Sequence, residues 1–169
     1  PITKVDLSSL TKASFPYKVI ENEKNCGIHY SRVAGIKTAK YKWLIFLDQD
    51  DELEDDTFYT QMRLIHDVSN KFRIIGNGIY QYGEINKKIF KNKKMIKLSV
   101  KEDAFLKVRN LIKSPGQCII NKELIPKYWM NNVLENNGSD DWFLWILVKN
   151  EGLSFIENNE IVYKHRFNK

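Results

Sequence analysis

Apolar and polar positions follow two different spacing patterns along the first half of the chain. Apolar runs at 17–21, 42–47 and 72–82 predict strands. Apolar or small residues at helical spacing predict a helix from 28 to 40 and a second one starting near 55. Because strands alternate with helices here, the pattern indicates an α/β fold with a mainly parallel sheet flanked by helices.

The second half of the chain is less regular. A lysine-rich segment at 85–101 is followed by a short predicted helix near 101–108. A longer helix is predicted at 139–152, with a serine or aspartate to begin it and a glycine to end it. Two short strands are predicted at 153–157 and 160–166, and they complete the chain.

The first two helices each present a face that we expect to be buried. The helix at 28–40 has small or apolar residues on one face, which would let its backbone lie close against the sheet: Ile28, Ser31, Gly35 and Ala39. The helix near 55 has an apolar stripe at helical spacing: Phe58, Met62, Ile65 and Val68.

Length and composition place these elements in one domain. The chain has 169 residues, of which 43% are hydrophobic, and this is enough for a sizeable core. No apolar run reaches the roughly 18–20 residues needed to span a bilayer. The chain starts at Pro1 without the pattern of a signal peptide, so we expect it to be a piece of a longer protein. Its two cysteines, Cys26 and Cys118, lack metal-site spacing and fit a reducing, cytoplasmic compartment.

The formal net charge of +6 is concentrated in the segment 85–101. Its lysines are interleaved with Ile89, Phe90, Met95 and Ile96; they are Lys87, Lys88, Lys91, Lys93, Lys94, Lys97 and Lys101. One interpretation is a solvated hairpin or loop edge protected by lysine. The other is a surface for anionic lipid head groups or phosphates. We expect no nucleic-acid partner, because no recognition motif accompanies the basic residues.

The strand predicted at 42–47 ends in an unusual group of carboxylates, Asp48, Asp50 and Asp51, followed by Glu52. Crowded carboxylates repel each other, so a positive group should lie beside them. In open α/β sheets, ligands bind beyond the carboxyl ends of the strands. An Asp-x-Asp pair at that position can hold Mg²⁺ or Mn²⁺ and leave coordination positions for phosphates.

This acidic group has three other possible interpretations: a calcium-binding loop, a phosphatase motif and a solvated turn. A calcium EF-hand loop needs Gly and Glu where Leu53 and Tyr59 stand. A phosphatase of the haloacid dehalogenase type usually has Thr or Val where Glu52 stands. A solvated acidic turn that caps the next helix remains open.

The segments "NCGIHYSRVAGIKTAKYKWLIFLDQDDEL", "SPGQCII" and "NGSDDWFLW" together resemble family 2 glycosyltransferases of GT-A fold, in particular bacterial polysaccharide-synthesis enzymes. The resemblance covers roughly 17–166. It implies a Rossmann-like, mainly parallel sheet within a single glycosyltransferase-like catalytic domain at 1–169. The family's first nucleotide-binding strands have no counterpart in this sequence, so we expect the amino-terminal strands of the fold to be missing from it.

The resemblance also assigns roles to individual residues. The donor nucleotide-sugar would contact Gly27, Arg32, Asp48, Gly116 and Gln117. A Mg²⁺ or Mn²⁺ cofactor would bind at Asp50 with Asp48 or Asp51, and His165 is a further candidate ligand. Asp141 would be the catalytic base, with Asp140 as the alternative within the pair.

These roles imply an inverting transfer of a sugar from a nucleotide diphosphate sugar to an acceptor hydroxyl, in bacterial cell-surface polysaccharide synthesis. The acceptor would be a glycan or a lipid-linked molecule, and the enzyme would be cytoplasmic, in peripheral contact with an anionic membrane at its inner face. Two alternatives stay open at this point: a non-catalytic remnant or binding module of the same fold, and a Mg²⁺-dependent phosphohydrolase.

Overall fold

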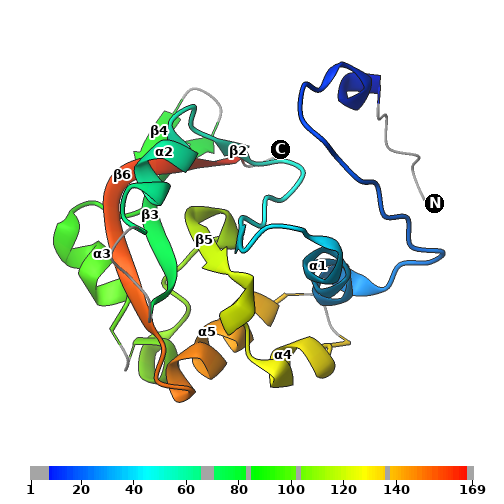
Figure 1. Cartoon of the computed structure of the whole chain (residues 1–169). Helices are drawn as coiled ribbons and strands as arrows, with labels where there is room; N and C mark the ends of the chain where they lie inside the picture. Colours follow the sequence, from blue (N-terminus) through cyan, green and yellow to red (C-terminus); the bar gives the residue numbers. More distant parts are fainter. Residues whose placement is uncertain (1–7, 66–70, 83–84, 102–103, 136–137, 167–169) are drawn as a thin grey trace.

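The computed structural model describes residues 8–65, 71–82, 85–101, 104–135 and 138–166. Its centre is a curled sheet with helices packed around it (Figure 1). The strands lie in the order β1-β5-β3-β6-β2, and β4 also pairs with β3. Their bounds are Trp43–Leu44 (β1), Glu52–Leu53 (β2), Lys71–Tyr82 (β3), Ile85–Lys88 (β4), Cys118–Asn121 (β5) and Ser154–Arg166 (β6).

The helices fall into two groups in Figure 1: α1, α4 and α5 lie toward one side of the sheet, and α2 and α3 toward the other. Their bounds are Gly27–Thr38 (α1), Thr57–Met62 (α2), Lys93–Ser99 (α3), Lys127–Asn131 (α4) and Asp140–Asn150 (α5). Four shorter helical segments are Ser8–Lys12 (η1), Ala104–Val108 (η2), Pro115–Gln117 (η3) and Lys122–Leu124 (η4). Within the described ranges, no helix is long and apolar enough to cross a membrane.

The two longest strands, β3 and β6, run side by side through the middle of the core (Figure 1). A Cβ atom on Gly76 of β3 would collide with the Val162 side chain of β6, so the close approach of these strands requires glycine. Val162 and Tyr163 are fully buried there, and α5 contributes Trp145 to the same hydrophobic cluster. This core therefore ties the last strand to the helix that precedes it.

The α/β class with flanking helices is confirmed, but the prediction of a mainly parallel sheet is wrong. Only β3 and β6 pair in parallel. The pairs β1–β5, β2–β6, β3–β4 and β3–β5 are all antiparallel. The reason is that β3 turns back into β4 as a hairpin before the chain enters α3. The chain therefore reaches β5 in the direction opposite to β3, which a strand-helix alternation does not reveal.

Three strand predictions are also wrong in extent. The segment 17–21 forms no strand, and its residues are exposed. Of 42–47, only Trp43–Leu44 pairs, at the edge of the sheet. The two strands predicted at 153–157 and 160–166 are one strand, β6, because an irregularity absorbs the polar residues between them. Ile75 pairs with Glu157, whereas Asn77 pairs with Ile161. An advance of four residues along β6 therefore lies opposite an advance of two residues along β3.

The long helices start and end close to the predicted positions, but the face that α1 buries differs. His29, Val33 and Ile36 are buried, whereas Ser31 and Gly35 are exposed. The prediction that the small-residue face packs on the sheet is therefore wrong. Small side chains permit a close approach, but the larger Val33 and Ile36 bury more apolar area, and this decides the orientation.

The helix predicted near 55 is the short α2, and it does not bury its apolar stripe. Phe58 is 58% exposed and Met62 is 39% exposed, while Thr57, Thr60 and Gln61 are buried. Val68 lies outside the described residues. The buried polar groups are hydrogen-bonded: the Thr57 hydroxyl donates to the carbonyl of Val162, which fixes α2 on β6.

Candidate functional site

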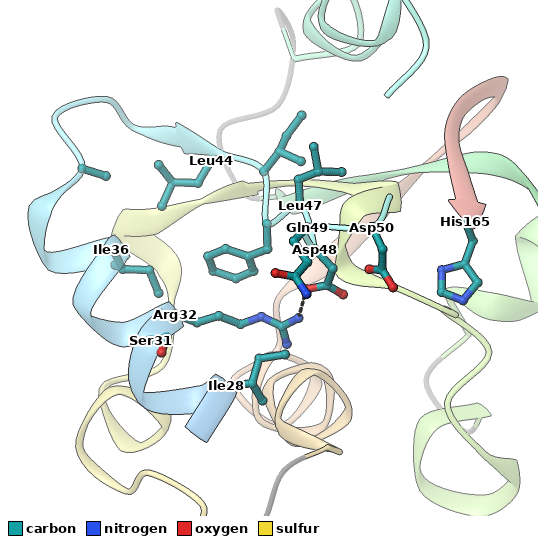
Figure 2. Close-up of a pocket in the computed structure, with 14 residues that line it drawn as sticks. Ile28, Ser31, Arg32, Ile36, Leu44, Leu47, Asp48, Gln49, Asp50 and His165 are labelled. Carbon is teal, nitrogen blue, oxygen red and sulfur yellow. Dashed lines mark hydrogen bonds and ion pairs between the residues drawn. The ribbon is translucent and has the colours of Figure 1, made fainter. Parts of the chain in front are cut away.

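A cavity of about 830 Å³ lies between one face of α1 and the chain that follows β1 (Figure 2). That chain leads into a turn at residues 48–51, which we call the acidic turn. The face of α1 that the core leaves open forms one wall. The opposite wall is the backbone and side chains of 44–50, and His165 from the end of β6 joins it. The predicted site residues that line this cavity are Arg32, Asp48, Asp50 and His165.

Arg32 is the positive group that the crowded carboxylates require. Its Nη2 donates to Oδ1 of Asp48 at 3.0 Å, as Figure 2 shows, and its Nη1 donates to Oδ2 of Asp140 at 2.8 Å. The Arg32 side chain is 10% exposed and that of Asp140 is 3% exposed, whereas that of Asp48 is 37% exposed. One buried guanidinium therefore connects the acidic turn after β1 with the start of α5.

Asp51 turns away from this cavity and into the protein. One of its oxygens accepts a hydrogen bond from the Tyr163 hydroxyl. The other accepts from the backbone N–H of Arg166 at 3.1 Å and lies 2.9 Å from Nδ1 of His165. Burial, together with the hydrogen bond to Asp51, raises the pKa of the Tyr163 hydroxyl. Asp51 thus fixes the end of β6, and with it His165, against the acidic turn.

Asp50 is exposed, and Figure 2 shows its carboxylate on the side of the acidic turn that faces His165. Mg²⁺ is commonly held by only one or two carboxylates, with phosphates and water as its other ligands, and Mn²⁺ accepts the same oxygen ligands. Asp48, Asp50 and His165 all line the cavity wall. Within the described part of the chain, no group of three or more His, Cys, Asp or Glu side chains is arranged to hold a metal ion.

The second pair of acids stands at the start of α5, after Ser139 in a left-handed conformation with φ 65°. Oδ2 of Asp141 accepts a hydrogen bond from Nδ2 of Asn110 at 2.8 Å. Burial raises the pKa of Asp141, although the hydrogen bond from Asn110 opposes the rise. Asp141 is therefore held in place as a partly buried carboxylate with a raised proton affinity, whereas Asp140 is engaged by Arg32.

The remaining predicted donor contacts are not at the cavity. Gly27 begins α1 with φ 83°, and its N–H donates to Oδ1 of Asn25. Gly116 is buried, and a Cβ there would lie 2.6 Å from Cε2 of Tyr163. Gln117 is also fully buried, where its Oε1 accepts from the backbone N–H groups of Lys113 and Ser114. These residues shape the backbone behind the site and do not line its cavity.

Sequence reasoning missed two residues that contact the predicted acids. Tyr163 lies two positions before His165, so it shares a face of the strand with that histidine, and the period of two residues could have identified it. Asn110 lies in a segment without regular secondary structure, between η2 and η3, and no pattern around it marks a contact with Asp141.

His29 was predicted to be structural, and its surroundings agree with that. It is 1% exposed, its Nε2 lies 3.1 Å from the carbonyl oxygen of Trp129, and its Nδ1 accepts from the N–H of Leu134 at 3.0 Å. Burial lowers its pKa. The other helical histidine that we expected to be structural, His66, lies outside the described residues.

Comparison with known proteins adds independent information. The glycosyl transferase family 2 matches residues 2–129, a range that contains Arg32 and the acidic turn but ends before Asp140. An uncharacterized glycosyltransferase of Haemophilus influenzae is 55% identical over 38 residues. That match covers 22% of this chain and spans only 13% of the length of the Haemophilus protein. Since the family match extends over most of the sequence, this chain belongs to glycosyl transferase family 2.

Proposed function

We propose that the protein is an inverting glycosyltransferase that moves a sugar from a nucleotide diphosphate sugar to an acceptor hydroxyl, in the synthesis of a bacterial cell-surface polysaccharide. The observation that supports this most strongly is the double ion pair of Arg32 with Asp48 and Asp140. It brings together two acidic groups that are far apart in the sequence, each suited to one half of the reaction.

The donor half of the reaction is assigned to the cavity beside α1. As the sugar leaves, negative charge grows on the diphosphate and must be neutralised. Arg32 supplies one fixed positive charge at the cavity wall. Asp50 and Asp48 would hold a divalent cation, with His165 as a further ligand, and a bound Mg²⁺ or Mn²⁺ supplies the Lewis acidity that stabilises a leaving phosphate. Asp51 keeps the turn in position through Tyr163 and the backbone of Arg166.

The acceptor half is assigned to Asp141. The attacking hydroxyl must lose its proton as it attacks, and this calls for a carboxylate on the side of the sugar opposite the diphosphate. A raised pKa makes Asp141 a stronger proton acceptor than an ordinary aspartate. Asp140 is less suited to this role, because its carboxylate is already bound to Arg32 and is almost fully buried.

The partners that follow are a nucleotide diphosphate sugar, with uridine or thymidine as the nucleoside, and a glycan or lipid-linked acceptor. A lipid-linked acceptor would require contact with a membrane. The lysine-rich segment at 85–101 would bind an anionic membrane through its positive charge. Such contact would take place at the inner face of the cytoplasmic membrane.

The test is a transfer assay with a panel of nucleotide sugars, in which the complete protein is compared with Asp141→Asn. This change keeps the side-chain shape but removes the proton acceptor, so turnover should fall by at least ~100-fold while donor affinity changes little. Asp55→Asn, which replaces an exposed acid just before α2, is the matched control and should transfer normally.

Three results of this assay would contradict a part of the proposal or all of it. Normal transfer by Asp141→Asn with none by Asp140→Asn would reverse the assignment within the pair. Donor binding without transfer to any acceptor would instead identify a binding module, and release of inorganic phosphate would indicate a phosphohydrolase.

A further inference from the structure

The surface formed by α3 and η2 combines exposed apolar side chains with lysines. On α3, Met95 is 37% exposed and Leu98 is 47% exposed, and these residues share a face of the helix because they are three positions apart. Leu106 on η2 is 61% exposed. We call the following set the α3 surface: Lys94, Met95, Leu98, Lys101 and Leu106.

These apolar residues are not needed for the core, because their neighbours already fill it. Ile96 of α3 is 2% exposed and Phe105 of η2 is fully buried. Each element therefore has an inner face that packs and an outer face that remains exposed. Single exposed apolar residues are common on protein surfaces, but several of them among lysines indicate a binding surface.

The chain through α3 is strongly basic, and Glu102 and Asp103 follow it before η2. The segment 85–101 contains seven lysines and no acidic residue. Lys94 on α3 and Lys101 just after it are exposed. Nζ of Lys97 lies 3.8 Å from Oε1 of Glu157. In Figure 1, α3 lies on the opposite side of the sheet from α1, the helix that forms one wall of the cavity. The lysines are thus not part of the donor site.

We propose that the α3 surface docks on an anionic lipid bilayer, with Met95, Leu98 and Leu106 in the head-group region and the lysines on the lipid phosphates. Lysine side chains are long enough to reach phosphates while neighbouring apolar residues enter the acyl boundary. A purely electrostatic partner, such as a nucleic acid, would use the lysines but leave the three apolar side chains in water. The combination therefore favours a bilayer.

This docking surface is joined directly to the acceptor-side carboxylate. The N–H of Ala104 donates to the carbonyl of Lys101, which connects η2 to the end of α3. The indole N–H of Trp142 donates to the carbonyl of Phe105 at 2.9 Å, and Asn110 after η2 donates to Asp141. A bilayer on the α3 surface would thus have a fixed position relative to Asp141. The link to Asp141 rests on the proposed function, because it matters only for an acceptor that is attached to a lipid.

The experiment is sedimentation of the protein with vesicles of phosphatidylcholine alone or mixed with phosphatidylglycerol, at low and high salt. The protein should bind the mixed vesicles at low salt and keep part of that binding at high salt, because salt screens charge but not apolar insertion. Lys94→Gln/Lys101→Gln should weaken binding at low salt by about 30-fold. Met95→Gln/Leu98→Gln should weaken it by at least about tenfold at both salts and remove the salt-resistant part.

Matched controls replace equally exposed residues on other elements. Lys37→Gln/Lys127→Gln on α1 and α4, and Phe58→Gln on α2, should bind vesicles like the unchanged protein. No binding at low salt would overturn the inference. So would normal binding by Met95→Gln/Leu98→Gln, because the surface would then be purely electrostatic. Transfer to a water-soluble acceptor should be unaffected in all these variants, so failure of vesicle binding and failure of transfer can be distinguished.

Discussion

The two acidic groups of this protein are built in opposite ways. Asp140 at the start of α5 is 2% exposed, and Asp141, the next residue of that helix, accepts a hydrogen bond from Asn110. Trp145 of the same helix is fully buried. The acidic turn after β1 follows a strand of only two paired residues, and its Asp50 is exposed. The acceptor-side acids are thus fixed by the hydrophobic core, whereas Asp48 and Asp50 on the donor side remain accessible to solvent, next to the buried Asp51.

This difference matches what each half of the proposed reaction needs. A catalytic base requires a fixed position and a tuned pKa, and burial in a packed core supplies both. A site for a charged donor requires solvent access and room for phosphates, which an open cavity lined by carboxylates and an arginine supplies. Arg32 donates hydrogen bonds to both groups, so it should be the most sensitive position in the comparison.

Arg32→Met should have the largest effect, because it leaves Asp140 buried without a counter-charge. Removal of one partner of a buried ion pair costs about 3–5 kcal/mol. The free energy of unfolding, measured by denaturant titration, should fall by that amount. Arg63→Met replaces an exposed arginine at the end of α2 and should change the free energy of unfolding by less than about 0.5 kcal/mol. A similar loss in both variants would show that the pairing with Asp140 has no special role.

Tyr163→Phe should have the next largest effect, and it acts on the donor side alone. It removes the hydroxyl that donates to Asp51, and a hydrogen bond to a charged group contributes about 1.5–3 kcal/mol. We expect that loss in the free energy of unfolding, together with weaker donor binding, because the turn and His165 lose a shared support. Tyr59→Phe, on an exposed ring of α2, is the control. If Tyr163→Phe bound the donor with unchanged affinity, the contact between Tyr163 and Asp51 would have no role in donor binding.

Asn110→Ala should have a smaller effect, confined to the acceptor side and visible in the pH dependence. Burial raises the pKa of Asp141, with Asp140 adding to the rise, whereas Asn110 and Arg32 oppose it. The base works only when ionised, so activity falls as the pH drops through this pKa. Without the hydrogen bond from Asn110 the pKa rises further, and the acid limb of kcat/KM should move to higher pH.

The control for this prediction is Asn131→Ala, at the exposed end of α4, which should leave the pH profile unchanged. If the acid limb stayed at the same pH in Asn110→Ala, Asp141 would not be the group whose ionisation limits the reaction.

The same contrast explains how much could be predicted from the sequence. The extents of α1, β3 and α5 were predicted within two residues, because their apolar periodicity and end signals are local. The pairing of the strands was not predicted correctly, because it depends on the hairpin β3–β4 and on the irregularity in β6. Which face of α1 is buried was also mispredicted, because long-range packing, and not the small residues on the helix itself, decides it.

For the site, the sequence identified the acids but not what holds them. The acidic turn, Arg32 and the start of α5 stand in recognisable motifs. Their supports come from distant segments: Asn110 lies 31 residues before Asp141, and Tyr163 lies 112 residues after Asp51. Such contacts depend on the tertiary fold, so a single sequence contains no local signal for Asn110.

The most direct test of separate donor and acceptor roles is calorimetric titration of the protein with uridine or thymidine diphosphate, with Mn²⁺ or with excess chelator. The unchanged protein and Asp141→Asn should both bind at least about tenfold more tightly with the metal. Asp50→Asn should lose that advantage. Equal affinity with metal and with chelator in the unchanged protein, or equal losses in Asp50→Asn and Asp141→Asn, would contradict the account.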